Sequence, residues 1–429
     1  MDKNKRLTVW LPVIIAASIA LGIFIGNHYL SISQGKKRSY SSGNKINAIL
    51  DIIDEQYVDT VSMSKLVEST IPKIFSELDP HSVYIPAEDA SVVNEELEGS
   101  FSGIGVSFNM QTDTILVISV ISGGPAEKAG LLPFDRIISI NDSIFSGKKK
   151  NQGEIMKTLR GAKNSTVKLG VQRGNSPELL YFDVTRGDVP VNSVDVSYEA
   201  AKGIGYIKVS KFARNTYNEF ITAIAKLKQA GCTSFVIDLR GNTGGYMDAA
   251  INMINEFMPE GRLIVYTEGK SFPRSDVYAN GTGTCKDAPI VVLTDEISAS
   301  ASEIFSGAIQ DNDRGTIIGR RTYGKGLVQT QMSLSDGSEM RLTIARYYTP
   351  SGRCIQKKYE MGNTDAYDQD IYNRYMHGEF DSADSIKMDD SLKYQTVGGR
   401  TVYGGGGIMP DIFIPRDTSG VTSYLKCGK

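Results

Sequence analysis

After Pro190 the chain alternates between strand-like and helix-like segments, and this alternation narrows the folds that its C-terminal half can adopt. Strands are predicted at 203–209 (GIGYIKV), 234–239 (SFVIDL) and 289–294 (PIVVLT). Amphipathic helices follow them: one that contains Phe220, Ile221, Ile224 and Leu227, one at 246–258 and one at 303–310. Parallel strands need long crossover connections, which are usually helices. The pattern therefore predicts an α/β core with largely parallel strands.

A strand-rich region precedes this core. Short strands separated by glycine turns are predicted at 103–108, 114–120, 135–142, 165–174 and 179–187, with two short helices at 123–130 and 153–161. These elements occupy about ninety residues, which is the size of one domain. We therefore expect a separate domain at 96–187, followed by the core at 188–355.

The first 35 residues include a long uncharged apolar stretch. Three basic residues precede it, and from Leu7 to Gly35 the chain has no Asp, Glu, Lys or Arg. This exceeds the apolar core of a signal peptide, roughly 7–15 residues, and suits a membrane-spanning helix of about 20 residues. We expect residues 1–35 to be a signal anchor with the remainder periplasmic or extracytoplasmic. A long cleaved signal is the alternative, because small residues lie near Ala17.

Residues 36–95 are expected to form a small helical region after the anchor. Apolar residues recur at helical spacing from Ile46 to Tyr57 and again from Leu66 to Leu78. Pro80 then stops the second helix, since the residue before a proline disfavours the helical conformation.

Composition excludes several classes of function. The 429 residues carry a formal net charge of −2, which gives no electrostatic case for nucleic-acid binding. The four cysteines form no C-x-x-C pair, so no zinc site is indicated. We expect neither a metal nor another cofactor.

One segment of the predicted core combines candidate nucleophiles with a candidate base. Serines occupy alternate positions at Ser298, Ser300 and Ser302, and Lys325 follows between two glycines. A phosphate loop is an alternative, because 319–325 fits G-x-x-x-x-G-K. Gly326 stands where that motif needs Ser or Thr, however, and a strand-like pattern follows instead of a helix.

A Ser-His-Asp triad is a second alternative, and the supply of histidine disfavours it. The chain has only His28, His81 and His377, and none follows a predicted core strand. Lysine can activate a serine instead, provided that its amine is neutral near pH 7, and burial lowers its pKa because it disfavours the ammonium form. The sequence therefore favours a Ser-Lys dyad.

Backbone donors for an anionic intermediate are expected at Gly244-Gly245, which follow a core strand and precede a helix. Each feature also has an ordinary structural interpretation. Ser300 with Glu303 fits the S-x-x-E capping box of a helix start, Lys325 fits a solvated turn, and the glycine pair fits a tight turn. Their joint occurrence in one α/β core favours catalysis.

The strand-rich domain carries a candidate peptide-binding loop at its start. Small residues there let successive amides point at a terminal carboxylate, and the following strand edge can accept an added strand. The alternative is an ordinary glycine turn. The residues of this loop are Gly103, Ile104, Gly105 and Val106.

The chain resembles the C-terminal processing peptidases, also called tail-specific proteases, which are Ser-Lys serine proteases with a PDZ domain. The resemblance rests on several blocks in one order and covers nearly all of the chain after the anchor. These blocks are LDPHSVYIP (78–86), GSFSGIGV with GGPAEKAGLLPFDRIISIN, DLRGNTGG (238–245), SASASEIFSGAIQD (298–311), RTYGKGLVQT (321–330), ARYYTPSGRCIQ (345–356) and GGGGIMPDIFIP (404–415).

The resemblance implies a serine endopeptidase with a crotonase-like α/β core and a PDZ domain that binds the C-terminal tails of protein substrates. It assigns Ser300 as nucleophile, Lys325 as general base and Gln329 as the residue that holds the lysine. The oxyanion amides map to Gly245 and Ala301. The family further suggests that the PDZ domain gates access, and leaves room for an activating partner or a homo-oligomer.

Two points stay open at this stage. The polar segment 356–395 has no counterpart that the resemblance assigns, so residues 356–429 are described only as a polar extension and the closing segment of the core. The alternative function is a membrane-tethered PDZ scaffold whose protease-like domain is inactive. The presence of Ser300, Lys325 and Gln329 argues against it.

Overall fold

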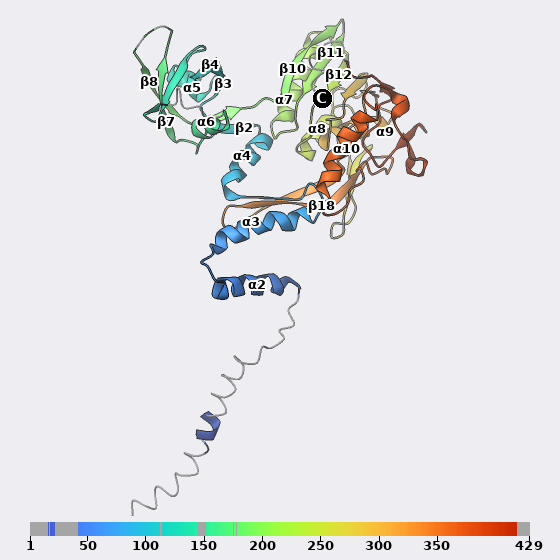
Figure 1. Cartoon of the computed structure of the whole chain (residues 1–429). Helices are drawn as coiled ribbons and strands as arrows, with labels where there is room; N and C mark the ends of the chain where they lie inside the picture. The colour runs from blue at the N-terminus through green and yellow to red at the C-terminus, as the bar shows by residue number, and fades with distance from the viewer. Residues whose placement is uncertain are drawn as a thin grey trace, which may run out of the picture. The chain divides into compact units, whose positions relative to one another are not determined.

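The computed structural model describes residues 16, 18–21, 42–111, 114–144, 152–174, 176 and 178–417 (Figure 1). The chain divides into two compact units, Met1–Thr70 and Ile71–Lys429. Within the described ranges no helix has the length and apolar character that a membrane crossing requires. The predicted anchor at 1–35 lies almost wholly outside them.

The helical region after the anchor begins with α2 (Ser42–Gln56), and α3 (Met63–Ser76) follows it. Both helices were predicted from apolar spacing. The second ends before the Asp79-Pro80 turn, as expected from the proline, and it also accommodates Pro72 inside the helix.

The strand-rich domain is an antiparallel sheet with two short helices. Strand order is β3-β4-β5-β7-β8, with β6 paired to β5, so β3 lies at one edge. The buried side is aliphatic, including Val117, Ile137 and Leu169. A further pair, β2 with β9, joins the entry and exit of the domain. The elements are β2 (Ser100–Gly103), β3 (Val106–Gln111), β4 (Thr114–Val120), α5 (Pro125–Ala129), β5 (Arg136–Ile140), β6 (Ser143–Ile144), α6 (Gln152–Leu159), β7 (Thr166–Gln172), β8 (Leu180–Thr185) and β9 (Gly187–Pro190).

The α/β core is built on a six-stranded sheet of order β10-β11-β12-β15-β16-β21. Only the β10–β11 pair is antiparallel, and the other four pairs are parallel, which confirms the expectation from the strand–helix alternation. The elements are β10 (Val194–Ala201), β11 (Ile204–Val209), α7 (Thr216–Gln229), β12 (Ser234–Asp238), α8 (Met247–Asn255), β15 (Ile290–Thr294), α9 (Ala301–Asp311), β16 (Thr316–Gly319) and β21 (Ile412–Phe413).

A second, antiparallel sheet packs on the other side of α9, and the sequence patterns did not predict it as a sheet. Its order is β1-β18-β13-β14, with β17 also paired to β18. Helix α9 contacts β16 of the first sheet and β13 of the second, which explains why every residue of this helix is buried. The added elements are β1 (Val83–Ile85), α4 (Ala87–Glu98), β13 (Leu263–Glu268), β14 (Ser275–Tyr278), β17 (Leu327–Ser333) and β18 (Glu339–Tyr348).

The segment 356–395 is partly buried, although its polar composition is typical of a solvated segment. It contains α10 (Thr364–Met376), whose Tyr367 and Arg374 are buried against the core. Short elements follow: η1 (Ala383–Ser385), η2 (Asp390–Leu392), β19 (Lys393–Gln395) and β20 (Thr401–Tyr403).

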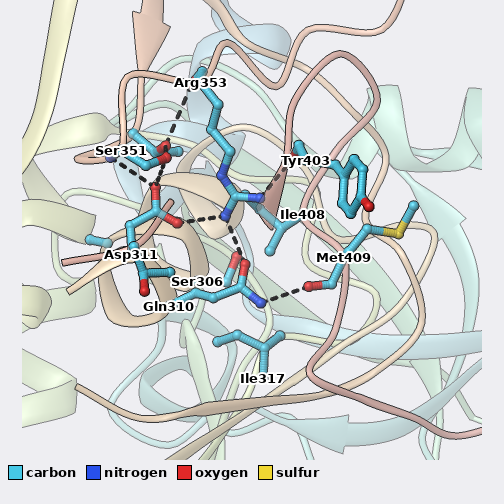
Figure 2. Close-up of polar contacts among 12 residues, drawn as sticks. Ser306, Gln310, Asp311, Ile317, Ser351, Arg353, Tyr403, Ile408 and Met409 are labelled. Carbon is cyan, nitrogen blue, oxygen red and sulfur yellow. Dashed lines mark hydrogen bonds and ion pairs between the residues drawn. The ribbon is translucent and has the colours of Figure 1, made fainter. Parts of the chain in front are cut away.

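A buried arginine ties the C-terminal end of α9 to the segments that close the core (Figure 2). Arg353 Nη2 donates to Asp311 Oδ1 and to Gln310 Oε1, both at 2.7 Å, and Arg353 Nη1 donates to the Tyr403 carbonyl at 2.8 Å. Gln310 Nε2 in turn donates to the Met409 carbonyl at 2.8 Å. Both charged side chains of the ion pair are 0% exposed, so each depends on the other for its counter-charge.

We predict that Asp311→Asn lowers the free energy of unfolding by about 3–5 kcal/mol, because it leaves the Arg353 cation buried without an anion. Urea unfolding followed by circular dichroism measures this. Asp390→Asn, which breaks the exposed ion pair with Lys393, is the matched control and should change the midpoint little. Equal midpoints for the two variants would contradict this role of the Arg353 ion pair.

Candidate active site

Ser300 stands at the N-cap of α9, immediately after the loop that leaves β15, in a conformation that few L-residues adopt. Its backbone angles are φ 56° and ψ −113°. Such positive-φ residues cost free energy and persist only where the surrounding structure holds them, which is common at functional sites. The site is therefore built around a strained serine.

The two neighbouring serines have structural partners, which singles out the middle one. Ser298 Oγ donates to the Leu239 carbonyl at 2.8 Å, and Ser302 Oγ donates to the Asn242 carbonyl at 2.9 Å. Both side chains are fully buried, whereas Ser300 lines a cavity. Ser298 and Ser302 thus anchor the start of α9 to the turn after β12 and leave Ser300 as the candidate nucleophile.

The glycine pair after β12 comes close to this serine. A Cβ at Gly244 would lie 2.8 Å from Ser300 Cβ, and one at Gly245 would lie 2.1 Å from the Phe212 carbonyl oxygen. Both glycines have positive φ, 103° and 139°. Gly245 lines the cavity together with Ala301, the first residue of α9, whose N–H has no partner within the helix. Two backbone segments therefore flank Ser300.

Lys325 lies in the loop between β16 and β17, largely enclosed by protein. Its Nζ donates to Gln329 Oε1 at 3.2 Å. Burial lowers the pKa of the Lys325 amine from its usual 10.5, and the nearby Arg341 cation lowers it further, while the Glu303 and Asp79 carboxyls act in the opposite direction. The surroundings of Lys325 thus favour the neutral form of its amine, which a Ser-Lys dyad needs.

Glu303 connects the serine to the lysine loop. Its side chain, 0% exposed, accepts hydrogen bonds from the N–H groups of Ser300 (2.8 Å), Gly324 (2.7 Å) and Lys325 (2.8 Å) and from Thr322 Oγ1 (2.5 Å). Burial raises the pKa of this carboxyl to about 7, against the effect of its four donors. The S-x-x-E pattern at 300–303 indicates only the helix cap, which is present, and gives no signal for this second role of Glu303.

A cavity of about 600 Å³ brings the predicted site residues together. Ser300, Lys325 and Gln329 line it with the proposed oxyanion residues Gly245 and Ala301. Apolar side chains form another part of the wall, including Met247, Ile304, Leu327 and Val328. The arrangement can hold an extended peptide segment next to a hydroxyl, an amine and backbone donors.

His81 also lies near the lysine, which the sequence analysis did not foresee. Its carbonyl accepts a hydrogen bond from Gln329 Nε2, and its ring Nε2 lies 2.9 Å from the Tyr367 hydroxyl. Burial and the charge of Lys325 lower the pKa of His81 to about 4. His377 is exposed at the end of α10, and His28 lies outside the described residues.

The phosphate-loop alternative finds no support in this geometry. The segment after Lys325 is strand β17, whereas a phosphate loop requires a helix there. Across the described part of the chain, no group of three or more His, Cys, Asp or Glu side chains could hold a metal ion.

The predicted peptide-binding loop, Gly103–Val106, belongs to the strand-rich domain and not to the cavity. It connects β2 to the edge strand β3, and Gly105 has φ 78°. Hydrogen bonds from Ala126 N to the Ile104 carbonyl (2.7 Å) and from Ile121 N to the Gly105 carbonyl (2.9 Å) hold the loop against the start of α5.

Comparison with known proteins identifies both domains. Residues 203–365 match the model of peptidase family S41, and residues 102–195 match the PDZ domain model. The carboxy-terminal processing protease CtpB of Bacillus subtilis is 35% identical over 318 residues, which cover 73% of this chain and 66% of that protein. The chain thus spans just under two thirds of the length of that relative.

Two further similarities extend this comparison. The protein named "Probable CtpA-like serine protease" of Staphylococcus aureus (strain N315) is 33% identical over 365 residues, covering 83% of this chain and 72% of that protein. The solved structure of the photosystem II D1 C-terminal processing protease is 25% identical, with a TM-score of 0.44, and the match covers 90% of this chain and 98% of that one.

We predict that Glu303→Gln destabilises the fold by about 1–3 kcal/mol, because an amide NH₂ would face buried backbone donors. The folded pKa of Glu303 is about 7, above its ordinary 4.5, so its contribution to stability is fully present below pH 4.5 and is lost as the pH rises through 7. Thermal unfolding measured from pH 4 to 8 should show that the stability of the Gln variant lacks this pH-dependent contribution. Glu260→Gln, at an exposed site, should retain it.

Proposed function

The chain belongs to peptidase family S41, as a C-terminal processing serine protease with a PDZ domain, and we propose that Ser300 is its nucleophile and Lys325 its general base. The observation that carries the proposal is the shared cavity, which a strained serine and an enclosed lysine line together. Glu303 supports it, because one buried carboxylate accepts from the N–H of both residues.

The proposed reaction begins when the neutral Lys325 amine takes the proton of Ser300 Oγ as that oxygen attacks the peptide carbonyl. The N–H groups of Gly245 and Ala301 stabilise the negative charge that develops on the carbonyl oxygen. The Lys325 ammonium then gives its proton to the leaving amine. In the second half, Lys325 deprotonates a water molecule that hydrolyses the acyl-enzyme.

Gln329 has a positioning role in this scheme. Its Oε1 accepts a hydrogen from Lys325 Nζ. A primary amine has two hydrogens and one lone pair when neutral, so a fixed acceptor for one hydrogen limits where the lone pair points. Gln329 thereby favours amine orientations that aim the lone pair into the cavity.

The PDZ domain is proposed to bind the C-terminal tail of a protein substrate by strand addition at β3. Two features support this assignment: β3 is an edge strand, and the Gly103–Val106 loop leads directly into it. The carboxylate of the tail would accept from the loop amides while the tail extends the sheet. The domain would then present the substrate to Ser300.

The location of the enzyme is part of the same proposal. Residues 7–35 carry no charged side chain and follow three basic residues, which supports an N-terminal signal anchor with the catalytic part periplasmic or extracytoplasmic. We also retain the crotonase-like description of the core and the domain division at 36–95, 96–187 and 188–355.

We predict that Ser300→Ala and Lys325→Ala each reduce casein cleavage by residues 36–429 by about a thousandfold or more, because each removes a member of one reacting unit. Lys211→Ala, which changes another lysine lining the cavity, is the control and should retain most activity.

For the unaltered enzyme kcat/KM should rise with pH as the Lys325 amine loses its proton, at a pH below 10.5. Undiminished cleavage by Lys325→Ala at neutral pH would refute the dyad. Inactivity of the unaltered enzyme alongside tail binding would favour the scaffold alternative.

We predict that amidation of the substrate's C-terminus raises KM by roughly tenfold or more, because it removes a charged acceptor from the loop amides. The comparison uses two peptides of one sequence, acid and amide, with the unaltered enzyme. Gly105→Val should reduce the difference between them, since a β-branched residue disfavours φ 78°. Equal kinetic constants for both peptides would count against tail recognition.

A further inference from the structure

The segment 356–395 packs across the loop that carries Lys325. Arg374 of α10 is buried and donates to the carbonyls of Thr322 (3.0 Å) and Arg321 (2.8 Å). The N–H of Lys357 donates to the Gly324 carbonyl at 2.9 Å. Three carbonyl oxygens of the lysine loop thus accept hydrogen bonds from the segment 356–395.

A second set of contacts fixes α10 in this position. The Lys357 amine lies 4.1 Å from the ring centroid of Tyr323 and 4.0 Å from that of Tyr367. It also donates to the Tyr367 carbonyl and to Asp370 Oδ2, both at 3.1 Å. The helix therefore cannot shift along the loop without breaking a cation–π pair and an ion pair.

From α10 a chain of hydrogen bonds reaches the proposed base. The Tyr367 hydroxyl lies 2.9 Å from His81 Nε2, and the rings meet edge to face with centroids 5.2 Å apart. The His81 carbonyl accepts from Gln329 Nε2, and Gln329 Oε1 accepts from Lys325 Nζ at 3.2 Å. The four residues come from three parts of the chain that are distant in sequence: α10, the turn at 79–82, and the stretch that runs from the lysine loop into β17.

The chemistry of these groups determines the direction of each bond. A carbonyl oxygen only accepts, so the Gln329 NH₂ must face His81 and its Oε1 must face Lys325. Gln356 Nε2 donates to the Tyr367 oxygen at 3.3 Å, which leaves the hydroxyl hydrogen for His81 Nε2. With a pKa near 4, His81 is neutral at physiological pH and can accept that hydrogen.

The turn that carries the His81 carbonyl is also held by Asp79. Asp79 Oδ1 accepts from His81 N (3.0 Å), from Ser82 N (3.1 Å) and from Thr343 Oγ1 of β18 (2.9 Å). The turn is thereby fastened to the second sheet, while its ring is fastened to α10. The position of one carbonyl oxygen depends on both attachments.

We propose that Tyr367 and His81 are positioning residues that act through the Gln329 amide to set the orientation of the Lys325 amine. The extension 356–395 is, on this inference, the support of the catalytic base. Both residues lie outside the ranges that match the family models, 102–195 and 203–365. The inference rests on the proposed role of Lys325 as general base.

The test uses Tyr367→Phe, which removes one hydroxyl and keeps the ring that contacts Lys357. We expect kcat for peptide cleavage, and the rate at which a fluorophosphonate probe phosphonylates Ser300, to fall about tenfold with KM unchanged. Tyr372→Phe is the matched control, because Tyr372 lies on the same helix with 59% of its surface exposed, and it should behave like the unaltered enzyme. His81→Phe should reproduce the effect of Tyr367→Phe.

A second background separates action through Gln329 from a general effect on folding. Gln329→Ala removes the amide that transmits the effect, so Tyr367→Phe should cost nothing further in that background. An equal tenfold loss there, a rise in KM, or an unaltered rate in the single variant would overturn the inference. Lys325→Ala is measured in parallel. If Lys325→Ala is inactive but Tyr367→Phe is fully active, only the positioning role is rejected. If Lys325→Ala retains activity, the proposed dyad itself is rejected.

Discussion

The geometry of the candidate active site depends on one buried carboxyl group, that of Glu303. The side chain is enclosed because α9 lies between two sheets, and a carboxyl without water requires donors from the protein. Those donors are the backbone of Ser300 at one end and the loop from Thr322 to Lys325 at the other. A single acceptor therefore brings Ser300 and Lys325 into one cavity.

The same enclosure explains how a strained serine can persist. Ser298 and Ser302 attach the chain on either side of Ser300 to the turn after β12, and the Tyr347 hydroxyl donates to the Ser300 carbonyl at 3.0 Å. Gly244 lets the turn after β12 come close to Ser300, since any side chain at position 244 would collide with Ser300. These contacts offset the cost of the unusual φ at Ser300.

The surroundings of Lys325 are assembled differently, mostly from parts of the chain that are distant in sequence. The turn at 79–82, the lysine loop, strand β17 and helix α10 each contribute one group to the environment of Lys325. This gives the polar extension a physical connection to the site, which its composition did not indicate. The predicted tail-binding loop lies elsewhere, on the separate sheet of the PDZ domain. The two proposed tasks, tail binding and support of Lys325, therefore belong to different parts of the chain.

The sequence alone determined the architecture and much of the site. Strand–helix alternation after Pro190 predicted the parallel sheet, glycine-punctuated strands predicted the second domain, and ordered motif blocks indicated the family that the comparisons confirm. Site residues with a local sequence pattern could be predicted in this way. They are the serines next to a capping box and the lysine between two glycines. The antiparallel sheet, the second role of Glu303 and the contacts of His81 with Gln329 and Tyr367 were decided only by tertiary structure. They join segments far apart in the chain, and hydrophobic periodicity reports how each segment is buried without reporting which distant segment buries it.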